Sequence, residues 1–201
     1  MDLSEEERSK REKYIIRETG GIWPVYEAFY LEAIIYSAGR AKDAFIRFNQ
    51  ALSKSKDPPT IVAIAHEALT HVAGLSRFFW PPGKKDINKA RGQKLREVFG
   101  LDNTSPLYDR KARNALEHFD ERLDEFLLQD LAGYVFPGPV VGSITEINDV
   151  LNKMFRFIDP TNEIFILLGE KYSFGPLKKI VDGVLEKAMK MNENGGRFES
   201  P

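Results

Sequence analysis

The stretch of residues 105–129 reads SPLYDRKARNALEHFDERLDEFLLQ. Ser105 suits the N-cap of a helix, and Pro106 suits the first helical position, where a missing N–H breaks no hydrogen bond. The apolar residues that follow recur three and four positions apart and so share one side of a helix; they are Ala112, Ala115, Leu116, Phe119, Leu123, Phe126 and Leu127. The pattern predicts one core-facing helix over residues 105–129.

The other side of this predicted helix is densely polar. Arg113 lies just off one edge of the apolar stripe, and His118 lies beyond the other edge, about 140° away around the helix axis. The residues between them on the polar side are Asn114, Glu117, Glu121, Asp124 and Glu125. This face is the candidate functional surface of the chain.

The composition predicts a single soluble globular domain. The 201 residues are 42% hydrophobic and 29% charged, which is enough chain to bury a core. The net charge of −1 gives no global field that would attract nucleic acid or an anionic membrane. The absence of cysteine excludes disulfides, thiolate metal sites and cysteine nucleophiles. With a charged N-terminal segment and no long apolar run, we expect a cytoplasmic protein without membrane contact.

Hydrophobic periodicity predicts a helical bundle. Residues 1–20 are expected to form a charged, loosely ordered arm, with an exposed helix over residues 5–18 as an alternative. The single domain is expected over residues 21–191, followed by a disordered tail at 192–201. Besides residues 105–129, the predicted helices cover residues 23–52, 60–80 and 88–99 and a last segment that begins at residue 175.

Two of these helices carry residues whose burial can be predicted. On the helix over residues 23–52, the predicted core side is Tyr26, Phe29, Tyr30, Ala33, Ile34, Ala41, Phe45, Phe48 and Leu52. On the next helix, His66 and His71 are five positions apart and therefore about 140° apart, which excludes the zinc-binding pattern of two histidines on one face. We expect His71 to be half-buried and His66 to face solvent.

The C-terminal third predicts a small β-hairpin. Residues 153–158 and 163–169 are rich in β-branched and aromatic residues, and they flank the turn sequence Asp159-Pro160-Thr161-Asn162. The segment at 133–142 is expected as a loop punctuated by glycine and proline, and a short helix is expected over 146–152. The predicted fold class is mainly α, a bundle of four to five main helices with a hairpin at 153–169 near the C-terminus.

The chain contains one cluster of basic residues. Its six members lie within 13 positions, at Lys84, Lys85, Lys89, Arg91, Lys94 and Arg96. Two interpretations remain open: a solvated helix face, or a phosphate-binding rim that contacts RNA, with Lys84, Lys85, Lys89, Arg91 and Lys94 as the candidate RNA-binding residues. We expect no metal and no cofactor, because adjacent Glu117 and His118 do not form the Glu-x-x-His pattern of a di-iron bundle.

The order Arg113-Asn114-Ala115-Leu116-Glu117-His118 resembles the Arg-x4-6-His motif of HEPN domains (higher eukaryotes and prokaryotes nucleotide-binding). These domains are small helical bundles, often dimeric, and many are metal-independent endoribonucleases whose two motif helices face each other across a cleft. The resemblance implies that His118 acts as a general acid/base on the ribose 2′-OH or the leaving oxygen. It implies that Arg113 stabilises charge on the phosphorane and that Asn114 orients the site.

The resemblance also implies partners, and it leaves an alternative open. A homodimer, an RNA substrate and an antitoxin or other protein partner are the expected partners of a HEPN domain of the toxin or phage-defence kind. The carboxylates around His118 would repel phosphate unless basic neighbours pair with them. The alternative is a non-catalytic helical module that forms homo-oligomers or binds a partner, with Arg113 and Arg122 paired to acidic residues at helical spacing.

Overall fold

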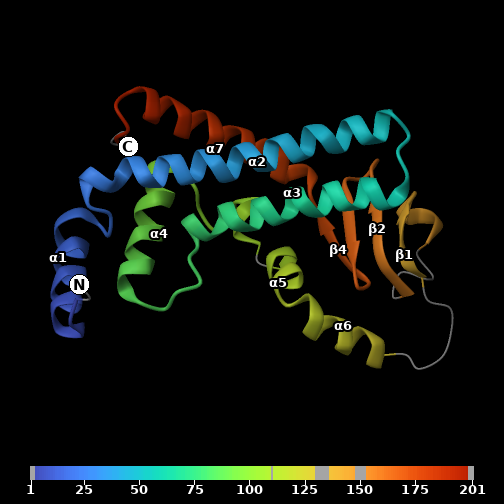
Figure 1. The fold of residues 1–201 in the computed structure, drawn as a ribbon, viewed down its shortest axis with the longest axis horizontal. Coiled ribbons are helices and arrows are strands. Elements are labelled where there is room, and N and C mark those ends of the chain that lie inside the picture. The colour runs from blue at the N-terminus through green and yellow to red at the C-terminus, as the bar shows by residue number, and fades with distance from the viewer. Residues whose placement is uncertain (1–2, 110, 130–135, 148–152, 199–201) are drawn as a thin grey trace.

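The computed structural model describes residues 3–109, 111–129, 136–147 and 153–198. Within these residues the chain is mainly α-helical and carries one small sheet near its C-terminus, which confirms the predicted fold class (Figure 1). Among the described residues, no helix combines the length and the apolar character that crossing a membrane requires.

Two long antiparallel helices form the centre of the fold. α2 (Glu27–Ser53) and α3 (Pro58–Phe79) run side by side, and α7 (Gly175–Glu193) packs against a different side of α2 (Figure 1). Asp57 caps α3 by accepting a hydrogen bond from the Thr60 N–H at 3.1 Å. The helices predicted over residues 60–80 and from residue 175 are confirmed.

The buried face of α2 differs from the one that its aromatic residues predict. The helix begins at Glu27, after a 3-10 turn over Pro24–Tyr26 (η1), rather than at residue 23. Phe29 is 71% exposed and Tyr26 is 55% exposed, so the prediction that both face the core is wrong. The apolar residues on the core side are Leu31, Ile34, Ala38, Ala41, Ala44, Phe45, Phe48 and Ala51. The small alanines let neighbouring helices approach closely, and this decides which face points inward.

One end of the bundle is closed by α1 (Glu5–Thr19) and α4 (Asp86–Phe99), which contact each other. α1 buries none of its residues, yet it is a capped helix rather than the loosely ordered arm expected for residues 1–20. The turn after α1 passes very close to α4. A Cβ at Gly21 would lie 2.6 Å from the Arg91 backbone nitrogen, and φ of Gly21 is +99°, so this position requires glycine.

The sheet has the strand order β1-β2-β3-β4, with β1 parallel to β2 and the other neighbours antiparallel. The predicted hairpin is confirmed as β2 and β3. Two further strands extend it, because the Gly/Pro segment predicted as a loop contains β1, and β4 follows the hairpin directly. The strands are Phe136–Val141 (β1), Met154–Asp159 (β2), Ile164–Leu167 (β3) and Glu170–Ser173 (β4).

Asp159 fixes the hairpin turn from inside the protein. Its fully buried carboxylate accepts hydrogen bonds from the backbone N–H groups of Ile144 at 2.8 Å, Thr161 at 3.0 Å and Asn162 at 2.9 Å. Burial raises the pKa of this carboxyl, but the hydrogen bonds outweigh burial and lower it overall. Where a helix is predicted over 146–152, the chain forms a 3-10 turn over Ile144–Glu146 (η3), and residues 148–152 lie outside the described residues.

The C-terminal segment up to residue 198 is held to the start of α2, whereas the sequence predicted a disordered tail over 192–201. The Arg197 Nε and the Phe198 backbone N–H donate hydrogen bonds to the Glu27 carboxylate at 2.9 and 3.0 Å. The Phe198 side chain packs against the main core. Residues 199–201 lie outside the described residues.

Candidate functional site at the α5–α6 junction

The helix predicted over residues 105–129 is broken at His118. A 3-10 turn over Pro106–Tyr108 (η2) precedes α5 (Lys111–Glu117), and α6 (Phe119–Leu128) follows the break. His118 has φ −109° and ψ 41°, which lies outside the helical region. The continuous helix is therefore a wrong prediction, although hydrogen bonds from the His118 N–H to the Asn114 carbonyl and from the Arg122 N–H to the His118 carbonyl still bridge the junction.

The break arises because the two short helices are anchored on different parts of the fold. α5 packs against α3, and its Ala115 is fully buried there. α6 is held by the sheet instead, since the Phe119 ring meets the Phe155 ring edge-on at 5.6 Å. The chain bends at His118, between these two anchors.

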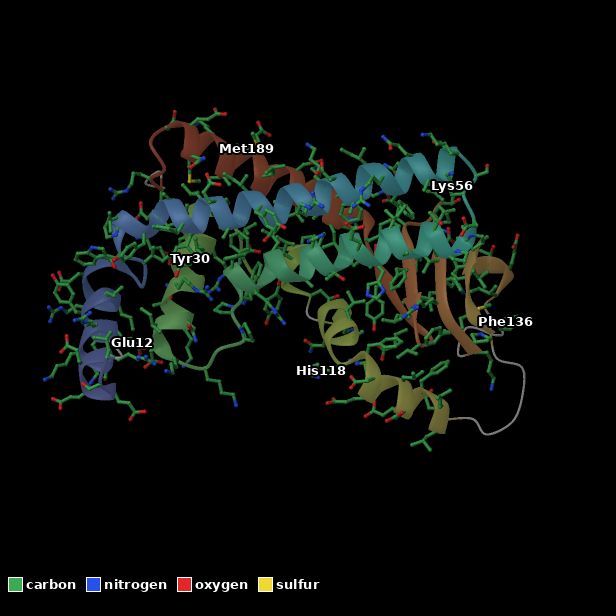
Figure 2. All side chains as sticks on the ribbon, viewed as in Figure 1. Glu12, Tyr30, Lys56, His118, Phe136 and Met189 are labelled. Atoms are coloured by element: carbon green, nitrogen blue, oxygen red, sulfur yellow. The ribbon has the colours of Figure 1, made fainter. Side chains whose placement is uncertain are left out.

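The bend leaves two of the three predicted catalytic residues on the surface. His118 and Asn114 are both exposed, and Figure 2 shows His118 at the α5–α6 junction on the side away from α2 and α3. The His118 Nδ1 lies 3.6 Å from a carboxylate oxygen of Glu121. Arg113 belongs to α5, but its side chain lies outside what the structure describes.

This arrangement suits acid–base chemistry. A carboxylate next to one ring nitrogen of histidine favours the proton on that nitrogen and leaves the other free to exchange a proton with a ligand. Within the part of the chain that the structure describes, no protein group bonds to the Nε2 of His118. The His118 imidazole thus has a carboxylate near one nitrogen and, within the described residues, no protein group bonded to the other.

A polar cluster that the sequence analysis did not identify holds α6 against β4. The Tyr172 hydroxyl donates to the Glu170 carboxylate at 2.6 Å, and an Arg122 guanidinium N–H donates to the same oxygen at 3.0 Å. The Tyr172 hydrogen bond is the main reason that the pKa of Glu170 is lowered, and Arg122 adds to the effect. Burial, followed by the Glu170 interactions, raises the pKa of Tyr172 far above its ordinary value. Arg122 therefore serves to attach α6, and it is not free to neutralise the acidic face of that helix.

Most of the predicted RNA-binding residues lie on α4 or just before it, and several have structural partners. Lys94 donates to the buried Glu27 carboxylate at 3.1 Å. The Arg91 guanidinium lies over the Tyr30 ring at 5.9 Å, and Lys89 pairs with Asp86. Two more members of the cluster, Lys84 and Lys85, are exposed in the loop before α4.

The basic cluster and the α5–α6 junction lie in different parts of the molecule. α4 contacts α1 and α3 at the end of the bundle where both chain termini lie, whereas α6 lies toward the sheet (Figure 1). Arg96, the sixth basic residue, donates to the Phe79 carbonyl at 2.5 Å and so joins α4 to the end of α3. The structure joins His118 to Asn114 through a backbone hydrogen bond but does not bring the α4 cations to them.

The two remaining histidines lie on α3. His71 is half-buried, as predicted, and its Nε2 lies 3.8 Å from the Glu67 carboxylate. His66 was expected in solvent, but it is half-buried against the Phe165 ring of β3, whose centroid is 6.2 Å away. Burial, followed by the positive charge of Arg156, lowers the pKa of the His66 imidazole. The sheet, which covers this side of α3, explains the difference.

Comparison with known proteins gives no relative from which a role could be transferred. No protein-family model, no curated protein and no solved structure matches this chain.

Proposed function

We propose that this chain is a HEPN-like domain that cleaves RNA without a metal ion at the α5–α6 junction. The observation that carries the proposal is the exposed His118 imidazole, which has one nitrogen 3.6 Å from Glu121 and the other without a partner among the described residues. RNA supplies its own nucleophile, the ribose 2′-OH, so one histidine that acts as a general base can start the reaction by taking that proton.

The other residues of the motif complete this chemistry. The 2′-OH oxygen attacks the adjacent phosphorus, the bond to the 5′ oxygen of the next nucleotide breaks, and a protonated histidine returns a proton to that oxygen. Arg113 would stabilise the negative charge that develops on the phosphoryl oxygens. A homodimer that places two α5–α6 junctions opposite each other would supply a second histidine and arginine to the same cleft, as the resemblance to HEPN domains implies.

The test is cleavage of a labelled RNA pool in excess EDTA by the wild-type protein, by His118→Ala and by a matched control. Asp124→Asn is that control, because it changes an exposed side chain of α6 that lies six positions after His118. Circular dichroism confirms that all three proteins are folded. The proposal predicts cleavage by wild type and Asp124→Asn and its loss in His118→Ala; equal cleavage by all three, or none by any, contradicts it.

A separate observation favours a second candidate, a non-catalytic module that self-associates. The aromatic surface, which we define as Tyr14, Val25, Tyr26, Phe29 and Tyr36, consists of large apolar residues that are 50–71% exposed on α1, η1 and α2. Contiguous exposed apolar and aromatic residues are typical of protein–protein contact surfaces. The neighbouring cations Lys10 and Arg11 are paired with Glu6 and Glu7. A surface whose charges are balanced can face an identical copy across a two-fold axis without repulsion.

A further inference from the structure

A second basic group lies beside the α5–α6 junction, on the sheet. The Arg156 guanidinium, on β2, stacks against two aromatic rings, with its carbon 5.1 Å from the Phe119 ring centroid and 4.7 Å from that of Phe155. Phe119 is the residue that follows His118, so this contact places Arg156 next to the first turn of α6.

The Arg156 side chain is half-buried, and one of its donors lacks a partner. Its Nε is buried without a hydrogen-bond acceptor, and within the described residues no carboxylate pairs with it. Buried N–H groups in proteins are almost always hydrogen-bonded, and an exception calls for an explanation, such as an absent ligand. The guanidinium carbon lies near both aromatic rings, so the contacts restrict the movement of this side chain.

Arg156 also lines an open hollow of about 420 Å³ between α3 and the sheet. The walls include the apolar residues Pro59, Val62 and Pro139, and the polar residues His66 and Glu67. The Glu67 carboxylate accepts two hydrogen bonds from Arg47, at 2.6 and 3.0 Å, so its charge is already compensated. Among the described residues that line the hollow, Arg156 therefore carries the uncompensated charge that an incoming ligand would meet.

We propose that Arg156 binds a phosphate of the RNA strand that His118 acts on, with His66 as a second hydrogen-bonding group in the same hollow. This inference rests on the proposed function. A guanidinium offers a planar pair of N–H donors that matches two phosphate oxygens, which a carboxylate-rich helix face such as that of α6 cannot provide. Arg156 thus supplies, from the sheet, the cation that the α4 cluster does not bring to the junction.

The test measures RNA affinity in a protein that cannot cleave. In the full-length His118→Ala background, binding of a fluorescein-labelled RNA is followed by fluorescence anisotropy for Arg156→Met and for Arg17→Met. Arg17 is a matched control because it is an exposed arginine on α1 that pairs with Glu18. The expected result is roughly tenfold weaker binding for Arg156→Met and a salt dependence reduced by about one phosphate contact, with no change for Arg17→Met. Equal affinity of the parent and Arg156→Met overturns the proposal.

Two further experiments identify the ligand and cover the case in which Arg156→Met does not fold. Competition with inorganic phosphate and with a mononucleotide shows whether the site takes an RNA strand or any free phosphate, and displacement of RNA by inorganic phosphate at equal concentration overturns the assignment to RNA.

If Arg156→Met does not fold, 4-thiouridine RNA is crosslinked to His118→Ala with Arg156 intact. Crosslinks in the peptides of residues 59–67 or 154–159 support the site, and crosslinks found elsewhere alone overturn it. Cleavage that needs His118, combined with unchanged affinity of Arg156→Met, refutes this inference alone; absence of both cleavage and RNA binding refutes the proposed function as well.

Discussion

The Glu27 carboxylate accepts a hydrogen bond from Arg197 at 2.9 Å, which joins the first residue of α2 to the end of the described chain. Lys94 donates to the other Glu27 oxygen at 3.1 Å, so one buried carboxylate connects α2, α4 and the C-terminal segment. Burial raises the pKa of Glu27, but the hydrogen bonds from Arg197, Phe198 and Lys94 together lower it below its usual range.

We predict that Glu27→Gln lowers the free energy of unfolding by about 2 kcal/mol, because Lys94 then stays partly buried without a negative partner. Urea unfolding followed by tryptophan fluorescence measures this effect. Glu186→Gln, an exposed residue of α7, is the control and should change the free energy by less than about 0.5 kcal/mol. Equal stability of the two variants would show that the hydrogen bonds of Glu27 contribute nothing to the free energy of unfolding.

The stability should also depend on pH through Glu27. Because the folded-state pKa lies below the unfolded value of about 4.5, the unfolded state binds a proton first as the pH falls. The stabilisation is therefore complete above about pH 5 and disappears as the pH falls through the folded-state pKa. The free energies of unfolding of wild type and Glu27→Gln should converge at acid pH. A difference between them that persists at low pH would contradict the assignment of this pH dependence to Glu27.

His66 should produce a separate pH dependence nearer neutrality. Its folded-state pKa lies below the ordinary value of 6.5, so the unfolded state takes up the proton first and stability falls as the pH drops below about 6.5. His66→Gln retains a polar side chain that does not titrate. The stability of this variant should change less than that of wild type between about pH 7 and pH 5; parallel curves for the two proteins would contradict the prediction.

The aromatic surface makes a prediction about oligomeric state. If it is the contact between two copies, Phe29→Ser combined with Tyr36→Ser should shift the protein from dimer to monomer in sedimentation equilibrium. Ile46→Ser is the control, because Ile46 is also an exposed apolar residue of α2 but is not part of the aromatic surface. A dimer that survives the double substitution would assign the contact to another face, and dissociation by Ile46→Ser would show that the effect is not specific.

Local sequence patterns correctly predicted the elements that are stabilised mainly by local interactions. They failed where contacts with a distant segment determine the structure. The turn that begins at Asp159 joins β2 to β3 as expected, and α3 begins at the local cap formed by Asp57. Hydrophobic periodicity could not identify which face of α2 is buried, because the exposed Phe29 and the buried alanines both recur at helical spacing. β1 was missed because Pro137 and Pro139 argue against a strand, although an edge strand tolerates them.

The order of Arg113, Asn114 and His118 is visible in the sequence, but the break at His118 is not, because residues 105–129 have a helical pattern throughout. The break depends on the contact of Phe119 with Phe155, which is 36 positions away. Arg156 could not be connected to the junction for the same reason, since its place beside Phe119 exists only in the folded sheet.

Glu121 should assist catalysis by orienting the His118 imidazole. Glu121→Gln keeps the size of the side chain but removes the charge 3.6 Å from Nδ1. We predict that cleavage slows by about tenfold, the equivalent of 1.4 kcal/mol, while RNA affinity stays unchanged or improves as a negative charge is lost. Single-turnover rates compared with those of Asp124→Asn test this, and equal rates for the two variants would exclude the orienting role.

The most direct measurement of the central claim is the chemistry of the RNA ends. RNA is incubated with wild-type protein in excess EDTA, and the fragments are analysed by mass spectrometry, alongside the same RNA with a 2′-deoxy sugar at the cleaved position. Our account predicts fragments that end in 2′,3′-cyclic phosphate and 5′-hydroxyl, and no cleavage at the deoxy position. Fragments with 3′-hydroxyl and 5′-phosphate ends, or intact RNA throughout, would contradict it.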